Sequence, residues 1–289
     1  MRSGHFVSEK MKRVWAVQLD LLDQFSQVCE QNNLQYFLDG GTLLGSVRHR
    51  GFIPWDDDVD VIMPRKDYDR LCSIANTVFR PPYFFQTALT EKMLFRAHAQ
   101  LRNSNTTGYI AADAKKDINK GIFLDIFILD GLPESKFTLS LHKTRIQLCR
   151  KIFWHAFDSD YSTLSPVKKL AYQMYHWTFH FFPFQKQYRF FDQKILAKYS
   201  RNDPKAVGDL TLEWNENVHW QREWFSSYLY FPFENLYLRV PSGYHKILSK
   251  QYGDYMLLPD ENHRGENRHG DIFLDPDRPY TCYFPKSKV

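Results

Sequence analysis

The strongest chemical signal in the sequence is an acidic cluster, in which four carboxylates fall within five positions: Asp56, Asp57, Asp58 and Asp60. Carboxylates this close repel one another, and the repulsion is costly unless a cation offsets it. Apolar residues alternate with the last two, so the pattern predicts a strand with Asp58 and Asp60 on one face. Side chains about 7 Å apart on one strand face can hold one or two hard divalent cations. Asp56 continues that face if the strand begins early enough.

Acidic clusters also occur as solvated loop tips, but the apolar residues beside this one demand burial and weigh against that interpretation. A calcium loop is excluded. Counting from Asp56, position 6 is Val61 where glycine is needed, and position 12 is Asp67 rather than Glu. The pattern leaves two sites open, a catalytic magnesium site and a D-x-D site for a nucleotide sugar. Both use carboxylates to hold a metal ion against a diphosphate.

A glycine-rich turn lies upstream of the acidic cluster. Gly40, Gly41 and Thr42 follow a short apolar stretch and open a predicted helix over 42–49. Glycine lets the backbone approach a ligand closely, a helix N-terminus offers free amide donors, and threonine adds a hydroxyl. A Gly-Gly turn alone is weak evidence for a phosphate site. Followed by a D-x-D strand, it predicts phosphate donors and metal carboxylates at neighbouring strand ends of one sheet.

Hydrophobic periodicity indicates the elements that would position these residues. Three-and-four spacing predicts an amphipathic helix over 8–32, with Ser8 at its N-cap, and a second helix over 67–77. Alternation predicts three strands, at 36–38, 58–63 and 94–102. The nearly continuous apolar run over 121–129 predicts a central strand that carries one carboxylate, Asp125.

The overall composition is that of a folded protein, with 289 residues, 43% hydrophobic residues and a net charge of +5. No apolar run approaches the ~20 residues that cross a bilayer, and Met1–Lys12 does not resemble a signal peptide. The four scattered cysteines form no C-x-x-C pair, which favours reduced thiols in a cytoplasmic protein. The modest positive charge does not imply a nucleic-acid partner.

Residues 136–205 differ from the rest of the chain, because they hold 13 Lys or Arg against 4 Asp or Glu, a net charge of +9. Within them, residues 151–191 contain 14 aromatic residues. The spacing predicts helices that break near 165–166 and at Pro183. Two interpretations stay open for this subdomain. It could lie against a membrane interface, which mixed aromatic and basic side chains suit, or it could pack its aromatic residues onto the catalytic sheet.

The segment from Phe37 to Asp60, FLDGGTLLGSVRHRGFIPWDDDVD, resembles the hallmark block of the LicD family. That family includes bacterial phosphocholine transferases and the fukutin-related proteins of animals. The similarity covers residues 8–130 well and 230–270 in part, whereas 136–205 matches nothing specific. It implies a single α+β catalytic domain over 1–289, with a mixed sheet of the nucleotidyltransferase type and residues 136–205 as a helical, basic, aromatic-rich insert.

The resemblance also implies roles for individual residues. The metal ligands, for Mg²⁺ or Mn²⁺, would be Asp56, Asp58 and Asp60. The substrate-binding residues would be Gly40, Gly41, Thr42, Arg48 and His49. Asp125 would supply the third catalytic carboxylate beside Asp58 and Asp60, and Asp130 is the fallback. Independently of the resemblance, the sequence shows a basic cluster in the tail, which would close over the donor, bind an anionic acceptor or form a solvated loop: His263, Arg264, Arg268 and His269.

The activity implied by the resemblance is transfer of a phospho-alcohol, typically phosphocholine, from a CDP-linked donor to a sugar hydroxyl. The acceptor would be a cell-surface glycan of the lipopolysaccharide, capsule or teichoic-acid type, or its lipid-linked precursor. We expect a cytoplasmic enzyme in peripheral contact with the inner face of the membrane. Three alternatives remain: a nucleotidyltransferase, a D-x-D glycosyltransferase, and a non-enzymatic protein that binds membrane or glycan.

Overall fold

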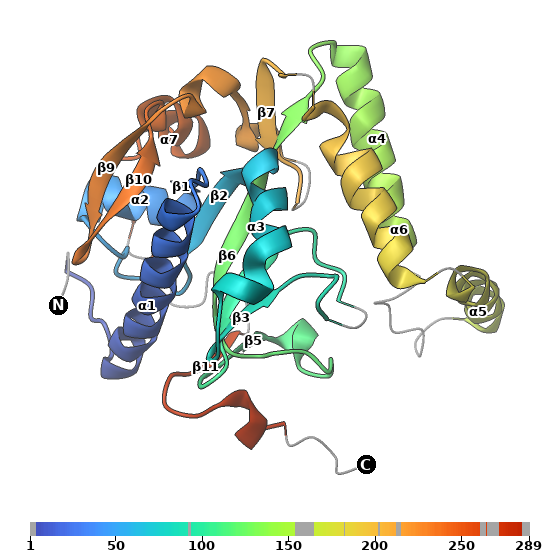
Figure 1. The fold of residues 1–289 in the computed structure, drawn as a ribbon, viewed down its shortest axis with the longest axis horizontal. Helices are drawn as coiled ribbons and strands as arrows, with labels where there is room; N and C mark the ends of the chain where they lie inside the picture. Colours follow the sequence, from blue (N-terminus) through green and yellow to red (C-terminus); the bar gives the residue numbers. More distant parts are fainter. Residues whose placement is uncertain are drawn as a thin grey trace.

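A computed structural model describes residues 4–91, 94–153, 165–181, 183–201, 203–211, 215–260, 264 and 272–284. Its centre is a seven-stranded mixed sheet flanked by helices, so the predicted α+β class is confirmed (Figure 1). The strands of this sheet are β1 (Phe37–Leu38), β2 (Asp60–Pro64), β3 (Tyr83–Gln86), β4 (Ala99–Asn103), β6 (Ile122–Leu132), β7 (Ala206–Asp209) and β8 (His219–Gln221). They run in the order β1-β2-β6-β4-β3, with β7 pairing both β6 and β8.

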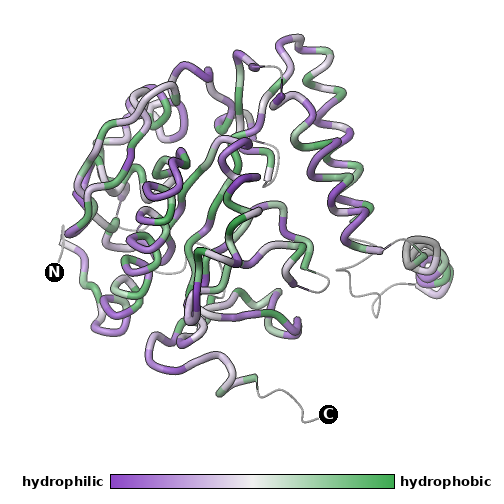
Figure 2. The backbone as a smooth tube through the Cα atoms, in the orientation of Figure 1, coloured by the Kyte–Doolittle hydropathy of each residue, from purple (hydrophilic) through white to green (hydrophobic). Residues whose placement is uncertain are grey.

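Strand β6 is the axis of the sheet, as the apolar run over 121–129 predicts. It pairs parallel to β2 and antiparallel to β4 and β7. Every one of its residues is buried, and Figure 2 shows hydrophobic residues along its length. A strand buried on both faces loses the polar alternation of a surface strand, which explains the continuous apolar pattern.

The two faces of β6 are not covered equally. Its even-numbered side chains, from Ile122 to Asp130, are 0% exposed, whereas Phe123, Asp125 and Phe127 on the other face keep 8–9%. Helices α1 (Glu9–Gln31) and α3 (Arg65–Val78) lie together on one side of the sheet (Figure 1). Arg65 of α3 bonds Asp130, which identifies the even face as the one under the helices. The odd face is therefore the less completely covered of the two, and we refer to it as the open face.

Helix α1 also fixes the acidic loop. Ser8 is its N-cap, as predicted, and accepts a hydrogen bond from the Met11 amide at 3.1 Å. Farther along, the Trp15 indole donates to the Asp56 carbonyl at 3.1 Å, and the Gln18 amide donates to the Asp57 carbonyl at 2.7 Å. These bonds hold the backbone of the acidic cluster before the strand begins.

Three predicted boundaries are wrong. Helix α2 (Gly40–His49) begins at Gly40 rather than Thr42, so the glycines belong to its first turn. Strand β2 begins at Asp60 rather than Asp58, because the chain turns at Asp56, whose amide bonds the Ile53 carbonyl at 3.0 Å. Strand β4 begins at Ala99, so residues 94–98 are not strand.

Two small sheets were not predicted. Strands β9 (Tyr228–Phe233) and β10 (Leu236–Pro241) form a hairpin before α7 (Tyr244–Tyr252). Strand β11 (Ile272–Asp275) pairs with β5 (Thr107–Ile110). Four-residue strands whose partners lie far away in sequence leave little local signal. Single 3₁₀ turns occur at Ala111–Asp113, Glu216–Val218, Arg222–Phe225 and Tyr280–Cys282.

The basic segment is helical, as predicted, with α4 (Lys136–Phe153), α5 (Pro166–His180) and α6 (Phe184–Phe190). A π-helical turn (Phe191–Ile195) and a 3₁₀ turn (Leu196–Tyr199) follow. The helix starts at 166 and 184 confirm the predicted breaks. Phe153, Phe184, Tyr188 and Phe191 form a second buried cluster, so part of the aromatic excess packs internally. Helix α5 stands away from the body of the protein (Figure 1).

Candidate active site

A row of polar side chains crosses the open face of the main sheet, over five of its seven strands. Gln86, at the β3 end of this row, donates to Glu91 and lies outside the carboxylate site. The register places Gln86 of β3 opposite Gln100 of β4, Gln100 opposite Asp125 of β6, and Asp125 opposite Asp60 of β2. Asp39 follows β1, and its amide donates to the Asp60 carbonyl at 3.1 Å. Five adjacent strands thus bring polar side chains from residues 39 to 125 into one line, and three of these are carboxylates.

The first turn of α2 closes against this row. Gly40 has a φ of +50°, in the left-handed region, and a Cβ there would lie 3.2 Å from Asp60 Oδ2. A Cβ on Gly41 would overlap Asp56 Oδ2. Thr42 Oγ1 accepts the Asp60 amide at 2.8 Å, which ties the helix to the start of β2. Both glycines are therefore needed for close approach, and they set the positive end of the α2 dipole beside the carboxylates.

The acidic cluster lies in the loop that leads into β2. Carboxylate oxygens of Asp56, Asp57 and Asp58 all lie within 4.8 Å of one another. Burial, followed by the charges of Asp56 and Asp125, raises the pKa of Asp58 well above its usual value. Burial and the charge of Asp58 act in the same direction on the pKa of Asp60. Among the described residues, the group that could hold one ion is Asp56, Asp57 and Asp58, so Asp57 is added to the predicted set. Asp60 is not part of that group, although the charges of Asp58 and Asp56 act on it.

These carboxylates fit a divalent metal ion. Clustered carboxylate oxygens are the ligands that Mg²⁺ and Mn²⁺ prefer. Burial, and after it the charges of neighbouring carboxylates, raise the pKa of Asp58 and of Asp60. A bound cation would relieve the repulsion among the ionised groups. Small movements of the loop side chains would bring their oxygens from 4.8 Å to the spacing of a shared ion.

Asp125 differs from the other carboxylates because it has its own donors. His98 Nε2 lies 3.0 Å from Asp125 Oδ1, and Gln100 Nε2 donates to the same oxygen at 2.6 Å. Burial acts to raise the pKa of Asp125, but the hydrogen bonds and positive charges around it outweigh burial and hold the pKa below its usual value. In the described part of the chain, Oδ2 receives no hydrogen bond. Asp125 therefore offers one oriented oxygen to the open face.

Two further buried carboxylates were not assigned a role from the sequence. Burial, with the nearby charge of Asp209, raises the pKa of Asp39 to about 7. Asp209 lies opposite Leu129, on the odd face of β6, and burial raises its pKa as well. Asp39 follows a predicted strand and could have been found from its position. Asp209 lies on a short strand, β7, that had no visible pattern.

The sequence also missed His98 and Gln100. The pattern at 94–102 was interpreted through its apolar residues, Ala97, Ala99 and Leu101. The residues between them, His98, Gln100 and Arg102, are polar and yet no more than 8% exposed. Three polar side chains at alternate positions, one just before β4 and two within it, were the available signal, since buried polar groups require hydrogen-bond partners.

The structure does not bring Arg48 and His49 to the carboxylates. They lie in the last turn of α2, about 12 Å along the helix axis from Gly40. The Arg48 guanidinium donates to the carbonyls of Tyr255 and Leu257 at 2.8 and 3.0 Å. Their predicted role in phosphate binding is therefore not supported by their position. Of the predicted basic tail cluster, only Arg264 is described, over the Trp55 ring at 5.2 Å; the other three lie outside the described residues.

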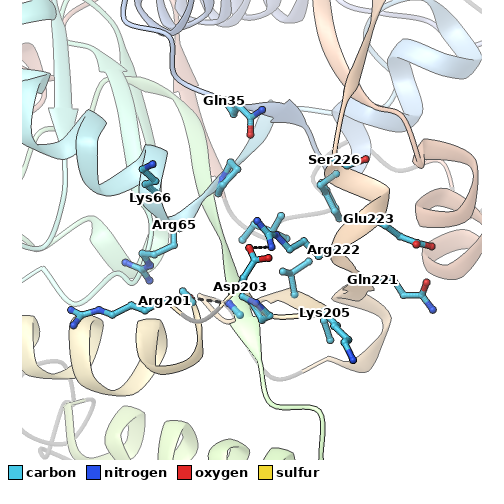
Figure 3. Close-up of a pocket in the computed structure, with 18 of the residues that line it drawn as sticks. Gln35, Arg65, Lys66, Arg201, Asp203, Lys205, Gln221, Arg222, Glu223 and Ser226 are labelled. Atoms are coloured by element: carbon cyan, nitrogen blue, oxygen red, sulfur yellow. Dashed lines mark hydrogen bonds and ion pairs between the residues drawn. The ribbon is translucent and has the colours of Figure 1, made fainter.

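A cavity of about 1180 Å³ lies at the opposite end of the same strands (Figure 3). Its lining includes Arg65 and Lys66 at the start of α3, and none of the predicted site residues. Figure 3 shows Asp203 and Arg222 joined as an ion pair, and Lys205 lies 3.7 Å from Glu134. Because these charges pair with each other, the cavity is a weaker candidate than the carboxylate row.

Comparison with known proteins identifies the family of this chain. The family model "LicD/FKTN/FKRP, nucleotidyltransferase domain" matches residues 33–131. The lipopolysaccharide cholinephosphotransferase LicD of Haemophilus influenzae is 34% identical over 256 residues, covering 84% of this chain and 90% of that protein. The chain belongs to the LicD family. As a member, it is an enzyme of the phosphotransferase class.

Two other matches are shorter. An uncharacterised protein of Rickettsia prowazekii is 32% identical over 117 residues, 40% of each chain. One of Rickettsia typhi is 43% identical over 47 residues, 16% of this chain and 15% of that protein. The matched family domain contains α2, the acidic loop, β2 and β6, and so holds every member of the polar row.

Proposed function

We propose that this LicD-family enzyme transfers phosphocholine from CDP-choline to a sugar hydroxyl of a lipopolysaccharide-type glycan, with a divalent metal ion. The observation that carries the proposal is the carboxylate row, set beside the N-terminus of α2 within the family domain. The similarity to a cholinephosphotransferase along most of the chain supports the choice of cargo and acceptor. We also propose that the catalytic core has the nucleotidyltransferase fold.

The loop carboxylates Asp56 and Asp58, together with Asp60, would hold the metal ion, which would neutralise charge on the donor diphosphate. Amides in the first turn of α2 bind phosphate oxygens, since Gly40 and Gly41 allow a close approach. Together these groups position the donor for in-line transfer, for which positioning and charge neutralisation supply most of the catalysis.

Asp125 is assigned to the acceptor. Its Oδ2 accepts a hydrogen bond from the sugar hydroxyl and orients the hydroxyl oxygen toward the phosphorus that carries choline. The new O–P bond forms as the P–O bond to CMP breaks, and the hydroxyl proton passes to Asp125 late in the transfer. A loose transition state builds little charge on the attacking oxygen, so a carboxylate with a low pKa suffices.

The test is nucleotide release from a panel of donors by the purified protein, with Mg²⁺, Mn²⁺ or EDTA present. CMP release from CDP-choline, dependent on metal and acceptor, supports the proposal. UDP or GDP from a nucleotide sugar would establish a glycosyltransferase instead, and pyrophosphate from a nucleoside triphosphate would establish a nucleotidyltransferase. Asp58→Asn and Asp60→Asn should each lose at least a hundredfold in CMP release, since they remove proposed ligands. Near-wild-type turnover in either variant would contradict the metal assignment.

The enzyme is further proposed to meet a lipid-linked acceptor at the cytoplasmic surface of an anionic membrane. Helix α5 and the residue after it carry a stripe of apolar side chains at three-and-four spacing, each at least 60% exposed: Val167, Leu170, Met174, Trp177 and Phe181. The segment around it has a net charge of +9, which suits anionic headgroups. In the described part of the chain, no helix has the length and apolarity needed to cross a bilayer.

Flotation with liposomes tests this contact. We expect the wild-type protein to float with anionic vesicles and much less with neutral ones, and Trp177→Ser with Leu170→Ser to abolish flotation. The matched control is Tyr237→Ser, because Tyr237 is 70% exposed on the distant β9–β10 hairpin. Equal flotation of the double variant and wild type would refute the role of α5.

A further inference from the structure

Asp125 is connected through one amide side chain to two guanidinium groups, those of the partly buried Arg96 and the buried Arg102. Gln100 is 3% exposed, and its Nε2 donates to Asp125 Oδ1. Its Oε1 accepts from Arg96 NH1 at 2.5 Å and also from Arg102 NH2. Arg102 is 1% exposed and is held by the carbonyls of Gly108 and Gly121, so it cannot turn away.

This arrangement fixes which end of the Gln100 amide faces Asp125. Guanidinium groups can only donate hydrogen bonds, so both must meet the amide oxygen. The NH₂ end is then left to point at Asp125, and it can only meet an acceptor there. Because His98 reaches the same oxygen, Oδ1 is fully engaged and the carboxylate cannot exchange its two oxygens.

We infer, resting on the proposed function, that Gln100 is a positioning residue that turns Asp125 so that Oδ2 faces the acceptor hydroxyl. The two arginines fix the orientation of the Gln100 amide, and the amide in turn fixes the orientation of the Asp125 carboxylate. Such outer partners typically contribute ten- to hundredfold to the function of the group that they orient. Neither the family match nor the sequence pattern assigns Gln100 a role.

Gln86 is a natural control for this role. It lies opposite Gln100 on β3, is 1% exposed, and its Oε1 accepts from the same two arginines at 3.0 and 2.6 Å. Its NH₂ end, however, donates to Glu91 Oε1 and the Asn119 carbonyl, both at 3.0 Å. The two glutamines thus share their environment on one side and differ in what they orient.

The experiment compares Gln100→Glu with Gln86→Glu. Each change keeps an oxygen for the arginines and replaces the NH₂ end by an oxygen. At position 100 that oxygen repels Asp125; at position 86 it repels Glu91. We expect kcat for phosphocholine transfer to fall about ten- to hundredfold in Gln100→Glu, with the Kd for CDP-choline by calorimetry unchanged. Gln86→Glu should keep its kcat within about threefold. Gln100→Met, which removes the donor without adding charge, should behave like Gln100→Glu and serves if that variant does not fold.

A crystal structure of Gln100→Glu gives a readout that does not depend on the reaction. Asp125 should be turned away from its wild-type rotamer, whereas in Gln86→Glu it should not move. An equal loss of kcat in Gln100→Glu and Gln86→Glu would overturn the inference. So would a crystal structure of Gln100→Glu in which Asp125 keeps its wild-type rotamer. If wild-type protein releases no CMP from CDP-choline while Asp125 turns in Gln100→Glu, the proposed function fails and the positioning role stands.

Discussion

The acidic cluster should make the metal-free protein less stable, so that removing one carboxylate raises stability while it destroys activity. The change is Asp58→Asn. Asp58 shares a region in which carboxylate oxygens lie within 4.8 Å of each other. At an effective dielectric constant of about 20, each such pair of charges costs about 3.5 kcal/mol. Asp58 is only half-buried, and protonation relieves part of the repulsion, so we expect a gain of about 1–3 kcal/mol. For a domain of this size that raises Tm by roughly 2–6 °C in EDTA.

The control is the same Asp-to-Asn substitution at Asp130, on the face of β6 that α3 covers. Asp130 is 0% exposed and accepts two hydrogen bonds from Arg65, at 2.8 and 2.6 Å. Removing one member of a buried pair costs about 3–5 kcal/mol, so Asp130→Asn should lower Tm by roughly 6–10 °C. Scanning calorimetry at pH 8 measures both variants, in EDTA and in Mg²⁺.

Metal ion and pH sharpen the contrast. Mg²⁺ should raise the Tm of wild type and of Asp130→Asn, but much less that of Asp58→Asn. Because the folded pKa of Asp58 is raised, the folded state holds its proton more firmly than the unfolded state does. The penalty is absent below about pH 4 and grows as pH rises through the raised pKa. A lower Tm for Asp58→Asn in EDTA at pH 8 would refute the repulsion, and an undiminished Mg²⁺ response would refute the ligand assignment.

Three further predictions follow from single contacts. The pKa of Asp39 is raised from 3.8 to about 7, so Asp39 should destabilise the metal-free protein increasingly as pH rises through that range. In denaturant titrations, Asp39→Asn should therefore raise the free energy of unfolding by up to about 4 kcal/mol at pH 8 and by little at pH 4. Gly41→Ala should push Asp56 aside and weaken Mg²⁺ binding by calorimetry on the order of tenfold with a small change in Tm, whereas Gly45→Ala, which meets the Gly51 carbonyl, should lower Tm. Arg48→Met should release the segment at Tyr255–Leu257 to proteolysis and leave the KM for CDP-choline within about threefold; a tenfold rise in KM would restore Arg48 to the phosphate site.

The parts of the site predictable from sequence were those with a dense local pattern. The continuous apolar run of β6 indicated a strand buried on both faces. Asp125 could be selected as a candidate because it is the only charged residue of that run before Asp130. Gly40, Gly41 and the acidic cluster lie within 21 residues, and their spacing was enough to indicate their joint role. The boundaries failed where tertiary contacts decide them, as at Asp58, where α1 holds the loop backbone through Trp15 and Gln18.

The parts that could not be predicted depend on strand register. Gln100 meets Asp125 only because β4 pairs with β6 in one particular alignment, and a shift by one residue would turn Gln100 to the other face. Arg48 looked like a phosphate ligand because it lies near the glycines in sequence. Its actual partners, the carbonyls of Tyr255 and Leu257, lie more than 200 residues away.

The carboxylates on the two faces of the main sheet differ in whether the fold supplies them with a cation. This difference separates carboxylates that stabilise the fold from those proposed to act in catalysis. Asp130 faces α3 and has its cation, Arg65, built into the fold. On the open face, Asp58 and Asp60 have neighbours of their own charge, and their raised pKa values record that cost. Asp125 is the exception there, since His98 and Gln100 supply donors to one of its oxygens. A carboxylate that must bind a removable ion is left without a fixed cation, whereas one that must aim an oxygen is held. The division of the row into metal ligands and an orienting carboxylate follows from which of its members the fold has supplied with donors.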